Sequence, residues 1–207
     1  AAFTATNLSA LDGTQVAALN TTQVRALTST QIGALDATDV AELTTTQIAA
    51  LTNTQILALA ATNVTALSDT QVGALSVTQL AQLTTATLRA FDATQVSGLN
   101  TTQVRALTTT QIGALDSTDV AEFAATQITA MTTSQIQAWS TTVIGDLTTT
   151  QVEALDVSQI PTLTTTQLDY LTTTSISAMN TTQIYAFGDT QIASFDGPQI
   201  EAYLAAV

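Results

Sequence analysis

Large apolar residues recur at every eighth position along nearly the whole chain. The segment LTTTQIAAL, residues 43–51, shows one unit: we label Leu43 position a and the following residues b to h, so that Leu51 is the next a. Position a falls at residue 3 and at every eighth residue to 203, without insertion or deletion, and position f is always Ile, Val or Leu. This octad predicts a repeat protein in which about 25 units form a single array over residues 1–207.

A longer repeat is superimposed on the octad. The segment from Asn20 to Leu43 recurs with few changes from Asn100 to Phe123, a shift of 80 residues. We interpret this as a duplication of residues 11–90 as residues 91–170. Because 80 is divisible by 16 and not by 24, the duplication favours two octads per superhelical turn over three.

The octad fits neither a continuous helix nor a plain strand. In a continuous helix the apolar position would rotate by about 80° per octad and leave any buried face. In a strand, positions a and f would point to opposite faces. A helix that restarts in every octad fits better, because position b is Ser, Thr, Asp or Asn in all full octads except those of Ala60, Ala124 and Gly188.

The restarting helix is supported by the rest of the unit. Gln usually stands at e, three residues after b, which gives the capping-box pattern, and a and f occupy the two positions of a hydrophobic staple. Such short helices are stable only when packed. The sequence therefore predicts an all-α solenoid of very short helices. A β-solenoid is the alternative, because Thr, Ile and Val favour strands.

Two prolines and the C-terminal segment test the assignment of helix positions within the octad, which we call the frame. Pro198 falls at N2, where proline is tolerated, whereas Pro161 falls at N5 and would remove a helical hydrogen bond. We expect the helix around Pro161 to end early or the frame to be shifted there. Residues 187–207 depart from the consensus, with aromatic residues at a, and we expect them to form either a C-terminal cap or the junction with a further domain.

Composition excludes several classes of function. The net charge is −13, Lys is absent, and the cations are three arginines, so the chain lacks the basic surface that nucleic acids require. No apolar run is long enough to cross a membrane. Cys and His are absent, which removes thiolate and imidazole ligands and the usual general base. The chain begins in mid-pattern without Met, so we expect a fragment or a processed piece. The acidic, Thr-rich composition is typical of extracellular bacterial proteins.

The octads resemble the Thr-rich repeat arrays of very large bacterial secreted or cell-surface proteins, including hemolysin-like and adhesin-like ones. Residues 107–115 (LTTTQIGAL) and 147–155 (LTTTQVEAL) carry the resemblance most plainly, and it covers Phe3 to Tyr203. It implies a structural segment between functional ends, located outside the cell or at its surface. It supplies no catalytic residue, and the glycine-aspartate nonapeptide that binds calcium in many such proteins is absent.

Acidic residues and threonines are the candidates for chemistry. Two acidic clusters could bind a hard cation through oxygen ligands, or their aspartates could cap helices, and we favour capping. These clusters are Asp36, Asp39 and Glu42, and their duplicates Asp116, Asp119 and Glu122. For the threonines at d we favour methyl groups packed inward and hydroxyls bonded to local backbone. The alternative is an exposed hydroxyl array that orders water or binds ice.

The remaining prominent residues have structural interpretations. We interpret the Gln row at e as capping partners, with a sugar-binding comb as the less favoured alternative. Trp139 and the Phe residues at a are expected in the core, and Tyr170 and Tyr185 on the surface. Arg25 and Arg105 lie at g, where residues vary freely, and are expected to be solvated.

The sequence thus predicts no catalytic, cofactor-binding or metal-binding residues and requires no cofactor. We expect a non-enzymatic spacer or rod within a bacterial secreted or surface protein. The alternative is an adhesive or ice-binding module that uses the repeated Thr hydroxyls. Among partners we exclude nucleic acid and membrane insertion. Self-association and flanking domains of a larger chain remain open, and no ligand is indicated.

Overall fold

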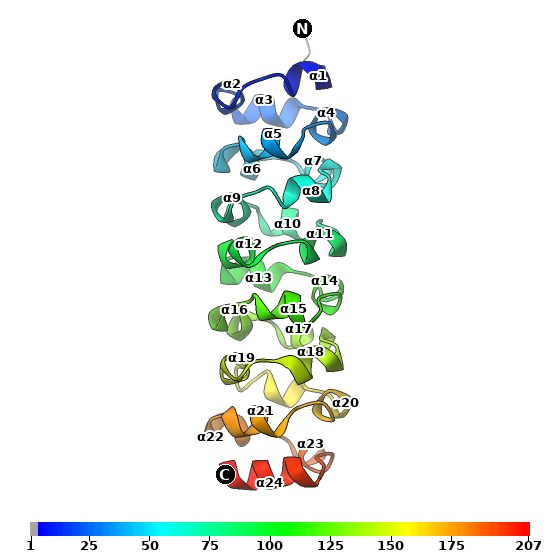
Figure 1. Ribbon diagram of the computed structural model, residues 1–207, viewed down its shortest axis with the longest axis vertical. Coiled ribbons are helices and arrows are strands. Elements are labelled where there is room, and N and C mark those ends of the chain that lie inside the picture. The colour runs from blue at the N-terminus through cyan, green and yellow to red at the C-terminus, as the bar shows by residue number, and fades with distance from the viewer. Residues whose placement is uncertain (1–3) are drawn as a thin grey trace. The chain divides into compact units, whose positions relative to one another are not determined.

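The chain folds into a succession of very short helices, as the computed structural model shows (Figure 1). The structure describes residues 4–207, so Phe3, assigned to position a, lies outside the described residues. Within that range every regular element is helical and none is a strand. The predicted all-α solenoid is confirmed, and the alternative of a β-solenoid is wrong. No helix among the described residues is long and apolar enough to span a bilayer.

Each octad contributes one element. The first thirteen are α1 (Ala5–Leu8), α2 (Gly13–Ala17), α3 (Thr21–Ala26), α4 (Ser29–Gly33), α5 (Ala37–Ala41), α6 (Thr45–Ala50), α7 (Asn53–Ala58), α8 (Ala61–Val64), α9 (Asp69–Gly73), α10 (Val77–Leu80), α11 (Thr85–Arg89), α12 (Ala93–Gly98) and α13 (Thr101–Ala106). The others are α14 (Thr109–Gly113), α15 (Ser117–Ala121), α16 (Ala125–Ala130), α17 (Thr133–Ala138), α18 (Thr141–Asp146), α19 (Thr149–Glu153), η1 (Ile160–Thr162), α20 (Thr165–Leu168), α21 (Thr173–Ala178), α22 (Thr181–Ile184), α23 (Asp189–Ile192) and α24 (Gly197–Ala206).

The chain divides into two compact units, Ala1–Leu107 and Thr108–Val207. The first unit holds α1 to α13 and the second holds α14 to α24 with η1. A single array over residues 1–207 therefore stays a prediction, as does the role of residues 187–207 as a cap.

Helix α6 shows how one octad folds. Thr44 at b has an extended backbone and is the N-cap; its Oγ1 accepts from the amide N–H of Gln47 at 3.2 Å, while Gln47 Oε1 accepts from the amide N–H of Thr44 at 2.8 Å. This is the predicted capping box. Leu51, the next a, leaves helical geometry with φ −57° and ψ 137°, which ends the helix and starts a new octad.

Positions a and f form the core of each unit. Ile48 at f is completely buried, and Leu51 at a is 4% exposed. The predicted core positions of Trp139 and the aromatic residues Phe91, Phe123, Phe187 and Phe195 are confirmed, since all are buried. Burying one such aliphatic side chain stabilises the fold by about 1.5–3 kcal/mol. Packing between octads therefore stabilises helices that could not persist alone.

Three octads make one superhelical turn, because each helix packs on the helix three octads later. In the first unit α3, α6, α9 and α12 form one such stack, and in the second unit α16, α19, α21 and α24 form another. The expectation of two octads per turn, drawn from the 80-residue duplication, is wrong. The duplicated block holds a whole number of octads and not a whole number of 24-residue turns. It follows that an octad can occupy any of the three sides of a turn.

Pro161 changes one helix without shifting the frame. Instead of an α-helix, its octad forms a turn followed by the 3₁₀ segment η1 (Ile160–Thr162). The amides of Gln159, Thr162 and Leu163 each donate to the carbonyl three residues earlier. Proline has no N–H at N5, so the chain adopts the tighter i to i−3 pattern. Pro198 lies at N2 of α24, as expected.

The last helix differs from the others. Helix α24 continues through Tyr203, which would otherwise start a new octad, and reaches Ala206. The Tyr203 ring meets those of Phe187 and Phe195 edge-on, with centroid distances of 6.3 and 6.0 Å. Because these rings lie at successive a positions, the apolar column of the core ends in an aromatic cluster.

Proline scanning tests the position of each helix start. We expect Ala49→Pro, at N5 of α6, to destabilise the first unit by about 3 kcal/mol through loss of a helical hydrogen bond and a clash with the preceding turn. Thr45→Pro, at N1 of the same helix, should change stability by less than about 0.5 kcal/mol, because that amide has no intrahelical partner. Urea unfolding followed by circular dichroism measures both. Equal effects at the two positions would contradict the assigned frame.

Candidate functional site

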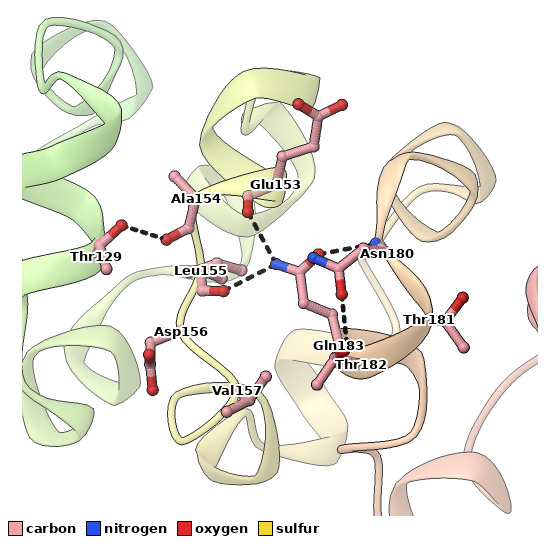
Figure 2. A pocket seen from close by; sticks show the side chains of 10 residues that line it. All are labelled: Thr129, Glu153, Ala154, Leu155, Asp156, Val157, Asn180, Thr181, Thr182 and Gln183. Carbon is pink, nitrogen blue, oxygen red and sulfur yellow. Dashed lines mark hydrogen bonds between the residues drawn. The ribbon is translucent and has the colours of Figure 1, made fainter.

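The Gln side chain at position e makes the same set of hydrogen bonds in most octads, and Gln183 in α22 is representative (Figure 2). Its Oε1 accepts from the amide N–H of Asn180 at 2.9 Å, and Asn180 Oδ1 accepts from the amide N–H of Gln183 at 3.0 Å. These two bonds close the capping box within the octad. The predicted capping role of the Gln row is thereby confirmed.

The other end of the same side chain reaches the previous turn. Gln183 Nε2 donates to the carbonyl oxygens of Val152, Glu153 and Leu155 at 2.9, 3.1 and 2.8 Å, and Figure 2 shows the bonds to Glu153 and Leu155. Only 1% of the residue is exposed. One buried amide thus satisfies an N–H at its own helix start and carbonyls at a corner one turn away. We call this arrangement the glutamine bridge.

The bridge recurs at fixed separations in both units. In each case Nε2 donates to the f carbonyl 31 residues earlier and the a carbonyl 28 residues earlier. In the first unit the bridging residues are Gln47, Gln55, Gln71, Gln79, Gln95 and Gln103. In the second unit they are Gln151, Gln159, Gln167, Gln183, Gln191 and Gln199. Each bond contributes about 1 kcal/mol net, and an orphaned buried carbonyl costs more.

Exposure separates the two roles of these glutamines. Gln15 and Gln23 complete capping boxes, yet both are exposed because no earlier turn lies against them among residues 4–207. Gln55 makes the same capping box and is 2% exposed, because its Nε2 is inserted between the carbonyls of Val24 and Leu27. Stacking of turns, rather than capping, therefore buries the amide.

The sequence carried a signal for the bridge that capping alone does not explain. A capping box accepts Glu as readily as Gln at N3, and a carboxylate there would also complement the helix dipole. Glu nevertheless never occurs at e. Since Glu has no N–H to donate, its absence favours an amide donor at most e positions, with the carboxylates Asp39 and Asp119 as exceptions.

Asp39 shows how the bridge changes when a carboxylate stands at e. Its Oδ2 accepts from the amide N–H of Asp36 at 2.9 Å, and Asp36 Oδ1 accepts from the amide N–H of Asp39 at 2.9 Å, so the favoured capping interpretation of this pair is confirmed. Asp39 Oδ2 also accepts from Ser9 Oγ, 30 residues earlier, at 3.0 Å. The Asp39 carboxylate thus accepts where a Gln amide would donate, and the donor is instead the Ser9 hydroxyl of the earlier turn.

The duplicate cluster is also organised by capping. Asp116 Oδ1 accepts from the amides of Thr118 and Asp119 at 3.0 and 3.1 Å, and Asp119 Oδ2 accepts from the amide N–H of Asp116 at 2.9 Å. Within residues 4–207 no group of three or more acidic side chains converges as metal ligands would. The geometry therefore offers these clusters a role in starting helices.

Arg25 and Arg105 are exposed, as expected, but some residues at position g also make a second contact between turns. Arg25 Nε donates to the carbonyl of Ala50 at 3.0 Å, 25 residues later. Thr129 Oγ1 donates to Ala154 at 2.6 Å across the same separation. Where g is Gly33, a Cβ would lie 2.9 Å from the carbonyl oxygen of Ala58. At these positions, g supplies a donor or permits close approach of backbone to backbone, whereas other octads carry residues such as Ala49 or Leu57 at g.

The threonines at d lie on the surface, contrary to the favoured expectation of inward methyl groups. Thr46, Thr54 and Thr150 are exposed, as are the other threonines at d in the described chain. They are N2 residues and point away from a and f.

The predicted exposure of Tyr170 and Tyr185 is confirmed, at 54% and 63%. Trp139 Nε1 is buried without a hydrogen-bond partner.

A shallow, open depression of about 590 Å³ lies in the second unit, between α19, α22 and the segment that follows α19 (Figure 2). Its polar wall consists largely of groups already bonded to one another, including Thr129 and Gln183.

The carboxyl of Asp156, which also lines the depression, accepts two hydrogen bonds from Ser158. The bond from the Ser158 hydroxyl has the larger effect and the bond from its amide N–H the smaller one, and both lower the pKa of the Asp156 carboxyl below its ordinary value. A carboxyl shifted in that direction is a poor general base at neutral pH.

Comparison with known proteins identifies the type of repeat. The family described as the ALTTAQ repeat matches residues 24–53, 78–109 and 85–117. Residues 106–111 read ALTTTQ, so the six letters of the family description correspond to positions h, a, b, c, d and e. No curated protein matches the chain. These matches cover part of the chain and support a Thr-rich repeat family, in agreement with the repeated short helices of the structure.

Replacing Gln by Glu tests the bridge while leaving the capping box in place. We expect Gln55→Glu to destabilise the first unit by about 2–4 kcal/mol, because a buried carboxylate would face two carbonyl oxygens and donate to neither. Gln23→Glu should change stability by less than about 0.5 kcal/mol, since its side chain is exposed at a helix N-terminus. Denaturant unfolding at micromolar protein concentration compares them. Similar losses in both variants would show that capping alone matters.

Proposed function

We propose that the chain is a non-enzymatic structural module: a spacer within a bacterial secreted or cell-surface protein. One observation carries the proposal, namely that the same bridge joins successive turns in both units, from Gln47 to Leu19 and from Gln199 to Leu171. Buried polar side chains are used to connect turn to turn. The resemblance to bacterial secreted arrays supports the proposed location.

The proposed mechanism is geometric. Each turn contacts its neighbours, so the length of a unit increases with octad number while local structure stays the same. Because an octad fits any of the three sides of a turn, length can change in steps of one octad. The 80-residue duplication is consistent with such growth, since it adds ten octads and breaks no turn.

A binding module is the second candidate, and the exposed threonines favour it. Side chains such as Thr46, Thr54 and Thr150 present hydroxyls to solvent at regular intervals. Repeated hydroxyls could order water on ice or contact a glycan. Ice shaping and thermal hysteresis test the ice-binding version. We expect neither activity for a pure spacer, and ice shaping lost on replacing threonines at d with Lys would favour binding instead.

Length variants test the spacer proposal. Duplicating residues 43–66 adds three octads, and we expect the maximum dimension from small-angle X-ray scattering to grow by about 10 Å, the spacing of packed helices. Deleting residues 51–58 removes one octad and should leave the protein folded and slightly shorter. As a control, deleting residues 51–54 breaks the octad and should abolish cooperative unfolding. A maximum dimension independent of octad number would contradict the proposal.

A further inference from the structure

One octad inside the first unit has a buried threonine at the bridging position. Helix α11 carries Thr87 at e, and this residue is 6% exposed. In the other octads a bridge reaches the carbonyls 31 and 28 residues earlier, which for this octad are those of Ile56 and Leu59. Thr87 is too short to reach them and has no amide to donate. No side-chain donor of residues 4–207 bonds to either carbonyl.

The neighbouring octad on the same side of the unit shows that an amide need not be as long as Gln. Asn63 lies 24 residues before Thr87 and is one methylene shorter than Gln. Its Nδ2 still donates to the carbonyl of Leu35, 28 residues earlier. An amide of either length therefore bridges the two turns directly, and the contact at Thr87 differs because the amide itself is missing.

A small cavity lies where the carboxamide would be. Its volume is about 20 Å³, and its lining includes Ile56 and Leu59 from the earlier turn and Thr84 and Thr87 from the octad of α11. A single water molecule needs about 10–15 Å³ of such space. The cavity therefore has room for one water molecule and for no larger ligand.

The polar groups at this cavity complement a water molecule. Thr84 Oγ1 accepts from the amide N–H of Thr87 at 3.1 Å, and the two hydroxyl oxygens are 2.9 Å apart. When Thr84 donates to Thr87 Oγ1, the Thr87 hydroxyl keeps its own proton for a further acceptor. The carbonyl oxygens of Ile56 and Leu59 supply two acceptors. Buried carbonyls normally have a partner, and a polar cavity with two to four such groups binds water.

We propose that this cavity is a binding site for one ordered water molecule, which replaces the glutamine carboxamide. The water donates to the carbonyls of Ile56 and Leu59, as Gln55 Nε2 does to those of Val24 and Leu27, and it accepts from the Thr87 hydroxyl. The bridge between the turns is thus continued through water in an octad whose e residue has no amide.

A monovalent cation is the other ligand that carbonyl and hydroxyl oxygens attract. No carboxylate lines the cavity, so nothing there would compensate the charge of a buried ion. Water needs no such compensation, and it can use the Thr87 hydroxyl as a donor, which a cation cannot. The chemistry of the lining therefore favours a neutral ligand that both donates and accepts.

Exchanging the e residues of two octads tests the proposal. The relaxation dispersion of the ¹⁷O nucleus of water counts long-lived internal water molecules and is insensitive to exchange of hydroxyl protons. We expect Thr87→Gln to lose one such water relative to the wild type, because the carboxamide fills the cavity. Gln55→Thr should gain one, because Thr52 stands three residues earlier as Thr84 does for Thr87. Thr94→Gln, the same substitution at an exposed d position, should change nothing.

Stability provides a second measurement. Thr87→Gln should lower the equilibrium constant for unfolding by about 5- to 30-fold, because it restores a capping box and a direct bridge and releases an immobilised water. A crystal structure of the wild-type chain should show the water within hydrogen-bond distance of the Ile56 and Leu59 oxygens. Circular dichroism checks that each variant folds, and if Gln55→Thr does not fold, the comparison of the wild type with Thr87→Gln decides.

Three outcomes would overturn the proposal. The first is an equal number of long-lived waters in the wild type and Thr87→Gln. The second is a folded Gln55→Thr variant that gains no water. The third is a wild-type unfolding midpoint that rises when sodium or potassium chloride replaces choline chloride, with no such rise in Thr87→Gln, because the ligand would then be a cation. None of these results bears on the spacer proposal, which the length variants test.

Discussion

A helix of four to six residues leaves most of its backbone donors and acceptors without intrahelical partners. This constraint governs the structure, because every octad before α24 ends its helix before the hydrogen-bonding ladder is established. The glutamine bridge provides hydrogen-bond partners for both the unpaired donors and the unpaired acceptors. Oε1 and the N-cap side chain satisfy amides at the helix start, as in Gln47 with Thr44, while Nε2 satisfies carbonyls at a corner in the previous turn. A single side chain therefore couples local helix initiation to stacking.

Much of the local structure could be predicted from the sequence because its determinants lie within eight residues. The N-cap at b, the capping box with e and the buried positions a and f all follow from short-range chemistry, and the structure places them as predicted. The number of octads per turn could not be predicted from the sequence. It depends on the bend of the chain at each a residue, and the octad pattern is the same on all three sides of a turn. The 80-residue duplication misled for the same reason: equivalent octads need not be duplicated in whole turns.

The contacts between turns were missed because their partners lie 25 to 31 residues apart and are backbone carbonyls, which every residue has. Only indirect signals existed, namely the exclusion of Glu from e and the presence of donors or Gly at many g positions. The inward orientation assigned to Thr at d failed because N2 faces away from the buried side. Pro161 was recognised as a conflict, and the 3₁₀ segment is how the chain resolves it while keeping Gln159 in its bridge.

The buried Nε2 group of each bridging glutamine donates permanently to the earlier turn, and amide proton exchange measured by NMR tests this most directly. The side-chain NH₂ protons of Gln55 should exchange at least about 100-fold more slowly than those of the exposed Gln23 and Gln82, because exchange requires the turns to separate. Protection limited to the bridging residues would support the account. Equal exchange rates at Gln55 and Gln23 would contradict it, since the turns would then be joined by apolar packing alone.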